Sequence, residues 1–243
     1  MSIAENMMPM AIDQPVRESG LSRSPLATAV PAVSCNLSGK RALDRLLASI
    51  LLVPALPLIG LLMLLVRATS PGPGLIRQKR IGQGGKVFTL YKIRTMFADA
   101  EARTGAVWSR PGDPRVTVVG RILRRLHLDE LPQLVNVLKG EMSLVGPRPE
   151  RPELVPILSK AVPGYTDRHQ VPPGITGLAQ LSLPPDTDLD SVRRKLVLDL
   201  AYIRRASLLL DLQLLLCTCL YAVGIRGGLA LAAVASSEAA SMQ

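Results

Sequence analysis

The longest apolar run of the chain, residues 46–66, contains no charged residue and predicts a hydrophobic helix. At about 1.5 Å per residue a straight helix of this length would reach roughly 31 Å, enough to cross the hydrocarbon core of a bilayer. Pro54 and Pro57 lie in the middle of the run. Each proline removes a hydrogen-bond donor and clashes with the preceding turn, so we expect the helix to bend or break there.

Basic residues flank both ends of this run. Lys40, Arg41 and Arg45 precede it, and a second set of lysines and arginines follows within residues 67–94. A spanning helix would leave one of these flanks outside the cytoplasm, against the positive-inside tendency. The pattern therefore favours a re-entrant helix that dips into the membrane and returns to the same face, with a spanning helix as the alternative.

Two short segments, LIRQKRI and KVFTLYKI, surround the sequence GQGG and predict a β-hairpin. Lys92 lies in the second segment and Arg94 directly follows it, and their spacing of two residues would place them on one face of an extended chain. Two such cations could hold a diphosphate, Arg through its two-pronged guanidinium and Lys as a point charge. The alternative is a basic strand that faces solvent or lipid headgroups.

An acidic pair, Asp129 and Glu130, lies between two basic segments. Helical spacing of the leucines and valine at 128, 131, 134, 135 and 138 places the pair near the start of a helix. Adjacent carboxylates raise each other's proton affinity unless a cation intervenes, so the pair calls for Mg²⁺, an arginine, or both. Arg124 precedes the pair, and Arg148 follows it in the rigid turn GPRP. The alternative is a solvated acidic step favoured by the helix dipole.

Two more helices are predicted towards the C-terminus. Asp186 or Asp188 can cap the first, whose packed face would hold Val192, Leu196, Leu200 and Ile203. The second, residues 207–225, is apolar but contains Asp211 and Gln213, which is typical of an amphipathic helix at a membrane interface. The two histidines, His127 and His169, are expected to be structural.

Composition narrows the class of partner. The 29 Lys and Arg against 19 Asp and Glu give a formal net charge of +10, which indicates nucleic acid, a membrane surface or phosphorylated substrates. Aromatic residues make up only 3%, which argues against stacking on nucleic-acid bases. The three cysteines support neither a disulfide framework nor a zinc site.

These observations predict an α-rich α+β protein with a small β-hairpin and interfacial amphipathic helices. We divide it into a disordered tail (1–38), a re-entrant membrane helix (39–70), a cytoplasmic catalytic domain (71–226) and a loose tail (227–243). Chemically, an Asp carboxylate can attack phosphorus when a metal and arginines neutralise a diphosphate.

The segment LDELPQLVNVLKGEMSLVGPRP resembles the signature of the bacterial sugar transferases, the monotopic phosphoglycosyl transferases, and KRALD, YKIRTM, PGITG and DLAYI extend the resemblance over residues 40–225. The resemblance implies an enzyme that transfers a sugar 1-phosphate from a UDP-sugar to a polyprenol phosphate such as undecaprenyl phosphate. UMP is released, and exopolysaccharide, O-antigen or a related glycan is begun.

The same resemblance implies roles for individual residues. Asp129 would be the nucleophile that carries the phosphosugar, and Glu130 would hold Mg²⁺ with it. The residues that would contact phosphate are Lys92, Arg94, Arg124 and Arg148. It also implies a bacterial inner membrane protein with its catalytic domain on the cytoplasmic face, glycosyltransferases of the same pathway as partners, and no nucleic acid.

Some positions depart from the pattern of similar proteins. His127 replaces a small hydroxyl residue, Leu178 replaces a frequent Trp, Pro172 replaces an Arg, and residues 183–185 replace an NGRN-like run. These changes lie towards the expected sugar end of the site, so the sequence predicts no particular sugar. The alternative function is a non-catalytic basic membrane-surface protein of a glycan assembly complex.

Overall fold

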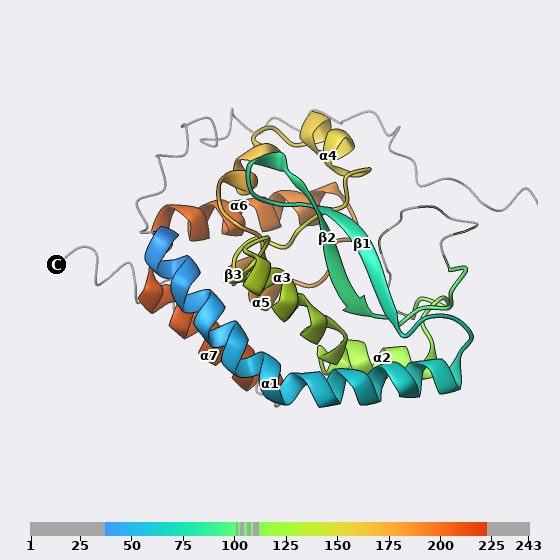
Figure 1. The fold of residues 1–243 in the computed structure, drawn as a ribbon. Helices are drawn as coiled ribbons and strands as arrows, with labels where there is room; N and C mark the ends of the chain where they lie inside the picture. Colours follow the sequence, from blue (N-terminus) through green and yellow to red (C-terminus); the bar gives the residue numbers. More distant parts are fainter. Residues whose placement is uncertain (1–36, 101, 103–104, 106–107, 109–111, 223–243) are drawn as a thin grey trace, which may run out of the picture.

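The computed structural model describes residues 37–100, 102, 105, 108 and 112–222. Most of the two predicted tails therefore lies outside the described residues. Within the described part, short helices surround two small sheets, and one long helix runs along an edge (Figure 1). This arrangement confirms the helix-rich α+β prediction.

The predicted hydrophobic helix is α1, Leu37–Thr69. The helix stays continuous through Pro54 and Pro57, and Figure 1 shows it as two arms that meet at an angle. A bend is the expected consequence of prolines inside a helix. In the described part of the chain, α1 is the one helix long and apolar enough to cross a membrane, and most of its apolar surface is exposed.

The predicted hairpin is confirmed. Strands β1 (Leu75–Ile81) and β2 (Val87–Ile93) pair antiparallel, with Leu75 opposite Ile93 and Ile81 opposite Val87. The turn η3, Gln83–Gly85, has positive φ at Gly84 (63°) and Gly85 (76°), a conformation that glycine adopts readily.

A second sheet, which the sequence did not reveal, joins β3 (Ser143–Val145) to β4 (Gly174–Thr176) in parallel. A Cβ at Gly174 would collide with the backbone of Gly146, so glycine permits the two strand ends to approach closely. The pairing brings the GPRP turn beside the PGITG segment, and so places Arg148 next to the C-terminal half of the domain.

The remaining helices are short except for α6 and α7. They are α2 (Val118–Arg125), η4 (Leu128–Gln133), α3 (Leu134–Lys139), α4 (Val155–Ala161), η5 (Tyr165–Gln170), α5 (Leu178–Ser182), α6 (Leu189–Arg205) and α7 (Leu208–Ala222). Asp188 caps α6 in a capping box with Ser191, and the predicted packed face is buried, which confirms that part of the prediction.

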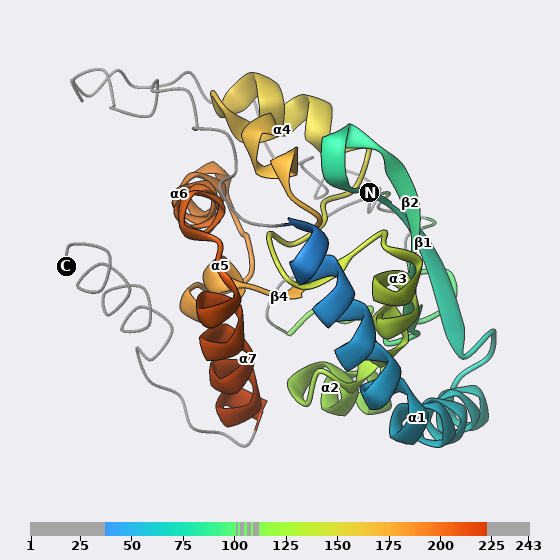
Figure 2. The ribbon, with the colours of Figure 1, turned by 60° about the vertical axis from the view of Figure 1, so that its left-hand side comes forward.

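Buried polar contacts fasten the N-terminal arm of α1 to the domain. Lys40 forms an ion pair with Asp211 of α7, whose other oxygen accepts a hydrogen bond from Tyr202 of α6. Asp44 accepts a hydrogen bond of 2.7 Å from Ser143 of β3. Figure 2 shows the resulting arrangement, in which α7 lies beside the first arm of α1.

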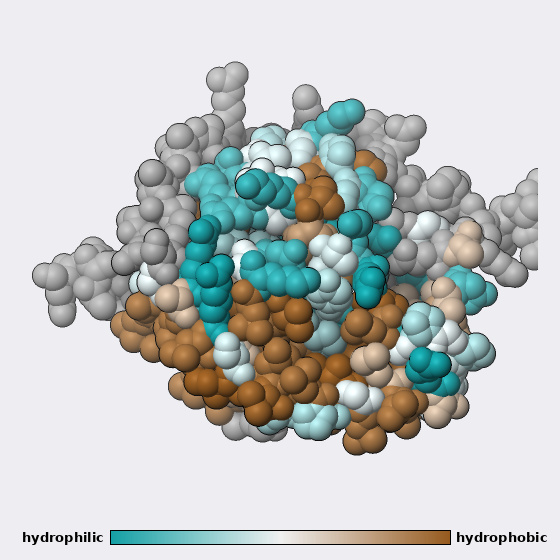
Figure 3. Space-filling view, in the orientation of Figure 1, coloured by the Kyte–Doolittle hydropathy of each residue, from teal (hydrophilic) through white to brown (hydrophobic). Residues whose placement is uncertain are grey.

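Exposed apolar side chains form a continuous band over α1 in the lower part of Figure 3. Helices α2 and α7 are also apolar on their exposed faces, as the sequence predicted for an interfacial helix at the C-terminus. The exposed apolar residues are Val118 and Ile122 of α2, Leu126 directly after α2, and Leu208, Leu209, Leu212 and Leu216 of α7. An exposed apolar surface of this kind marks contact with a membrane or a protein partner.

Candidate active site

The acidic pair lies in the first turn of η4, which packs against β2. The turn between α2 and η4 depends on His127, which has a left-handed backbone conformation (φ 55°). Among the described non-glycine residues, His127 is the one with a positive φ. Asp129 is only 1% exposed and Glu130 only 8%. Buried carboxylates require cations or hydrogen bonds, so these two are not the solvated acidic step that was the alternative.

Two predicted cations meet the pair. Lys92 Nζ lies 2.8 Å from Asp129 Oδ2 and 3.4 Å from Glu130 Oε1, so that a single ammonium bridges both carboxylates. Arg148 Nη2 lies 2.7 Å from Glu130 Oε1. Lys92 comes from β2 and Arg148 from the GPRP turn, and the hairpin and the β3–β4 sheet therefore converge on the pair.

These cations control the charge of Glu130. Burial alone would raise the pKa of Glu130, but Arg148 and Lys92 lower it below the ordinary carboxyl range. The pKa of Arg148 is raised in turn by Glu130. Glu130 is therefore ionised at neutral pH and cannot serve as a proton donor there.

Arg124 stands beside this group. Its Nε donates a hydrogen bond of 2.8 Å to Thr95 Oγ1. Burial lowers the pKa of Arg124, while the nearby charge of Asp129 acts in the opposite direction. Arg124, at the end of α2, is therefore close enough to Asp129 for the two charges to interact.

Arg94 is not brought to the site. It follows the end of β2, is 3% exposed, and donates hydrogen bonds to the carbonyl oxygens of Ser70 (2.7 Å) and Pro71 at the C-terminal end of α1. A Cβ at Gly72 would collide with this guanidinium, so the glycine leaves room for it. The structure thus uses Arg94 to anchor the second arm of α1 to the hairpin.

We expect Arg94→Met to destabilise the fold. The substitution leaves buried carbonyls at the end of α1 without donors, and hydrogen bonds to a charged group are worth about 1.5–3 kcal/mol each. Thermal unfolding in detergent should show a clear fall in Tm. Arg77→Met, on the partly exposed β1, is the control that should unfold near the wild-type temperature.

A buried ion pair that sequence reasoning missed supports the GPRP turn. Arg168 of η5 lies 2.7 Å from Asp199 of α6, and it donates hydrogen bonds to the carbonyl oxygen of Arg148 (2.9 Å) and to Tyr165 Oη (2.7 Å). Burial opposes the charge of Arg168, but Asp199 raises its pKa above the ordinary value. The one signal in the sequence was the DLAYI segment that contains Asp199, and nothing local indicated Arg168.

His169, beside Arg168, gives a prediction about pH. Burial and the charge of Arg168 lower the pKa of His169 to about 4. The unfolded chain therefore binds more protons than the folded one between about pH 6.5 and pH 4, and stability should fall as pH drops through that window. Comparison of Tm with His169→Gln at pH 7.5, 6 and 5 should show a shallower decline in the variant. An identical decline would contradict the prediction.

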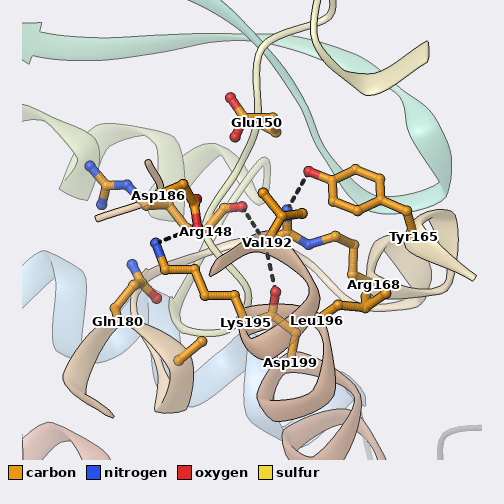
Figure 4. Close-up of a pocket in the computed structure, with 11 residues that line it drawn as sticks. Arg148, Glu150, Tyr165, Arg168, Gln180, Asp186, Val192, Lys195, Leu196 and Asp199 are labelled. Atoms are coloured by element: carbon orange, nitrogen blue, oxygen red, sulfur yellow. Dashed lines mark hydrogen bonds and ion pairs between the residues drawn. The ribbon is translucent and has the colours of Figure 1, made fainter. Parts of the chain in front are cut away.

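Two hollows meet at Arg148. The first, drawn in Figure 4, is also lined by Gln180, Asp186, Lys195 and other side chains of η5, α5 and α6. The second lies under the hairpin and is lined by Gln78, Arg80, Leu90, Lys92, Gln133, Arg148 and Pro149. Arg148, which pairs with Glu130, thus borders two spaces that could receive the two ends of one substrate.

A comparison with known protein families assigns the chain to one of them. Residues 35–224 match the family described as bacterial sugar transferase. The chain belongs to the bacterial sugar transferase family. The match covers every described element that builds the site, and it confirms the family that the sequence resembled.

Relatives of this sugar transferase come from several bacteria. A Bacillus subtilis (strain 168) protein, provisionally named an undecaprenyl-phosphate N-acetylgalactosaminyl 1-phosphate transferase, is 50% identical over 54% of this chain and 73% of its own. The UDP-glucose:undecaprenyl-phosphate glucose-1-phosphate transferase of Caulobacter vibrioides (strain ATCC 19089 / CIP 103742 / CB 15) is 44% identical over 78% of this chain and 71% of its own.

A third relative is longer. The UDP-N-acetylgalactosamine-undecaprenyl-phosphate N-acetylgalactosaminephosphotransferase of Aeromonas hydrophila is 43% identical over 71% of this chain but only 40% of its own length. The chain of this sugar transferase thus spans less than half of some relatives that it matches. The relatives' names also differ in the sugar, so that similarity alone does not select one.

The sugar transferase site offers few groups for a metal. No cluster of three or more His, Cys, Asp or Glu side chains that could hold an ion occurs among the described residues. Mg²⁺ nevertheless commonly binds through one or two carboxylates and completes its shell with water and substrate phosphates. The adjacent carboxylates of Asp129 and Glu130 fit that mode of binding.

Proposed function

We propose that this protein transfers a sugar 1-phosphate from a UDP-sugar to undecaprenyl phosphate, releases UMP, and so begins the synthesis of a glycan. The names of the relatives supply the reaction. The observation that carries the proposal is the buried pair of Asp129 and Glu130, held between Lys92 and Arg148. A protein that only bound lipid headgroups would have no need to bury two adjacent carboxylates.

The reaction proceeds in two displacements at one phosphorus atom. A carboxylate oxygen of Asp129 attacks the phosphorus that bears the sugar, and the bond from that phosphorus to the UMP oxygen breaks. The phosphosugar is then held as an acyl phosphate on Asp129. An oxygen of undecaprenyl phosphate attacks the same phosphorus, which restores the carboxylate and forms the lipid-linked diphosphate sugar.

The cations of the site neutralise negative charge and do not transfer protons. Lys92 and Arg148 can neutralise the diphosphate, and their positions are fixed by Glu130 before the substrate arrives. Arg124 adds positive charge from the side of α2. Asp129 and Glu130 would hold Mg²⁺, which when bound would supply further neutralisation of the phosphates.

The contacts of α1 favour a re-entrant path through the membrane. Its first arm is fastened to the domain by Lys40 and Asp44, and its second arm is fastened by Arg94. Both ends therefore belong to one side of the membrane, which we propose to be the cytoplasmic face of the bacterial inner membrane. The exposed apolar faces of α2 and α7 would lie in the interface, where the lipid acceptor enters.

The lipid-linked product would then pass to glycosyltransferases of the same pathway, which we propose as functional partners. We propose no nucleic-acid partner. The basic surface instead suits anionic lipid and nucleotide substrates.

UMP release tests the proposed function. Membrane-embedded protein is mixed with Mg²⁺, undecaprenyl phosphate and, one at a time, UDP-glucose, UDP-galactose, UDP-N-acetylglucosamine and UDP-N-acetylgalactosamine. We expect UMP and a lipid-linked sugar with at least one donor. Membrane binding without UMP from any donor would instead support a non-catalytic role in glycan assembly.

A further inference from the structure

The first hollow has no assigned occupant. Figure 4 shows Gln180 of α5, Lys195 of α6 and Asp186 of the loop between these helices gathered beside Arg148. The enclosed part of this hollow is small, about 30 Å³, which is room for about one or two water molecules. A ligand at its mouth could therefore place a single hydroxyl group in this space.

The lining of this hollow suits hydroxyl groups. Lys195 Nζ lies 3.1 Å from Asp186 Oδ1, and the two side chains are 15% and 18% exposed, so that the pair is shielded but still within reach of a ligand. Glu150 and Asp199 add two more carboxylates, of which Asp199 pairs with Arg168. Carboxylates accept hydrogen bonds from hydroxyl groups, and an ammonium group donates hydrogen bonds to them. These side chains together can therefore bind several hydroxyl groups of one ligand, each in a defined position.

Gln180 supplies an independent observation. Its Nε2 donates a hydrogen bond of 2.9 Å to the carbonyl oxygen of Ile175, which fixes the orientation of the amide. Its Oε1 is buried and has no hydrogen-bond partner among the described residues. A buried acceptor without a donor is costly, and a hydroxyl group of a ligand would satisfy it.

The second hollow has the opposite character. Its charged lining residues are Arg80, Lys92 and Arg148, and no carboxylate lines it. This lining suits the phosphate of a nucleotide better than a neutral sugar. The two hollows diverge from Arg148, as the sugar and the nucleoside diverge from the diphosphate of a UDP-sugar.

We propose that the first hollow binds the sugar of the donor, and that Gln180 and the Asp186–Lys195 pair determine which sugar is accepted. The second hollow would receive the phosphate of the departing UMP. This inference rests on the proposed function. Pro184 and Pro185 immediately precede Asp186 and fix φ at their own positions, which limits the freedom with which the loop presents its carboxylate.

Donor selectivity and nucleotide binding test the assignment together. The variants are Asp186→Asn, Lys195→Met and Gln180→Leu, and Asp190→Asn is the control because this exposed α6 carboxylate pairs with nearby Arg193 and does not line the hollow. We expect the ratio of kcat/KM between the preferred and the poorest UDP-sugar to change about 10–100-fold in the variants. Inhibition by UMP should remain at the wild-type level, as should all values for the control.

Calorimetric binding of UDP and of each UDP-sugar, with every protein carrying Asp129→Asn so that no UMP is formed, provides a readout that needs no turnover. The variants should lose the difference in Kd between the preferred UDP-sugar and UDP, while the Kd of UDP itself is unchanged. Equal losses for all UDP-sugars, or weaker binding of UDP or UMP, would overturn the assignment and indicate a nucleoside site. A wild-type protein that discriminates sugars in binding but releases no UMP would refute the proposed function and leave the sugar site supported.

Discussion

Asp129→Asn is expected to lower UMP release at least about 10⁴-fold, because the substitution removes the nucleophile of the first displacement. Asparagine keeps the size of the buried side chain, and Lys92 keeps Glu130 as a partner. The fold and the attachment to membranes should therefore survive. UMP release at saturating donor measures the effect, and Tm and membrane fractionation show whether the protein is intact.

Asp190→Asn is the matched control for the same change of atoms. Asp190 is largely exposed on α6 and forms an i,i+3 pair with Arg193. Such surface pairs contribute little, so UMP release should stay at the wild-type rate. Retention of wild-type activity in Asp129→Asn would remove this carboxylate from the chemistry.

Arg148→Gln is expected to reduce kcat about 10²–10³-fold, the usual cost of removing one preorganised donor from a developing charge. The guanidinium contacts both oxygens of Glu130, and a point charge cannot reproduce that geometry, so Arg148→Lys should be impaired to a smaller degree. The acid limb of the pH profile should also move to higher pH in Arg148→Gln, because Arg148 is the largest influence that lowers the pKa of Glu130.

Arg193→Gln, an exposed arginine of α6, serves as the control for this substitution. Measurement of kcat from pH 5 to pH 9 for all three variants separates a lost phosphate contact from a change in protonation. An Arg148→Gln protein with wild-type kcat would show that Arg148 does no more than pair with Glu130.

Elements with a strong local pattern could be predicted from the sequence. The hairpin was indicated by its turn residues, α6 by its cap and packed face, and α1 by its length and prolines. The contact between Arg148 and the acidic pair also agreed with expectation, because the rigid GPRP turn was expected to present this arginine to an anion. The contact of Lys92 with both carboxylates was not predicted, since Lys92 was expected to pair with Arg94 on a diphosphate.

Other features depend on contacts between distant residues. Strands β3 and β4 have three residues each, too few for a periodic pattern, and their pairing spans about thirty positions of sequence. Arg94 was expected beside Lys92, but the strand ends at Ile93 and the arginine turns to the end of α1 instead. The Arg168–Asp199 pair likewise exists only because η5 and α6 pack together.

The central claim is that Asp129 carries the phosphosugar, and intact-mass spectrometry of the protein with its preferred UDP-sugar and Mg²⁺, but without undecaprenyl phosphate, tests it most directly. We predict an added sugar phosphate on the peptide that contains Asp129, one UMP released per adduct, and loss of the adduct when undecaprenyl phosphate is added. UMP formed only in the presence of the lipid acceptor, with no adduct at any time, would contradict the claim and indicate direct transfer between the two substrates.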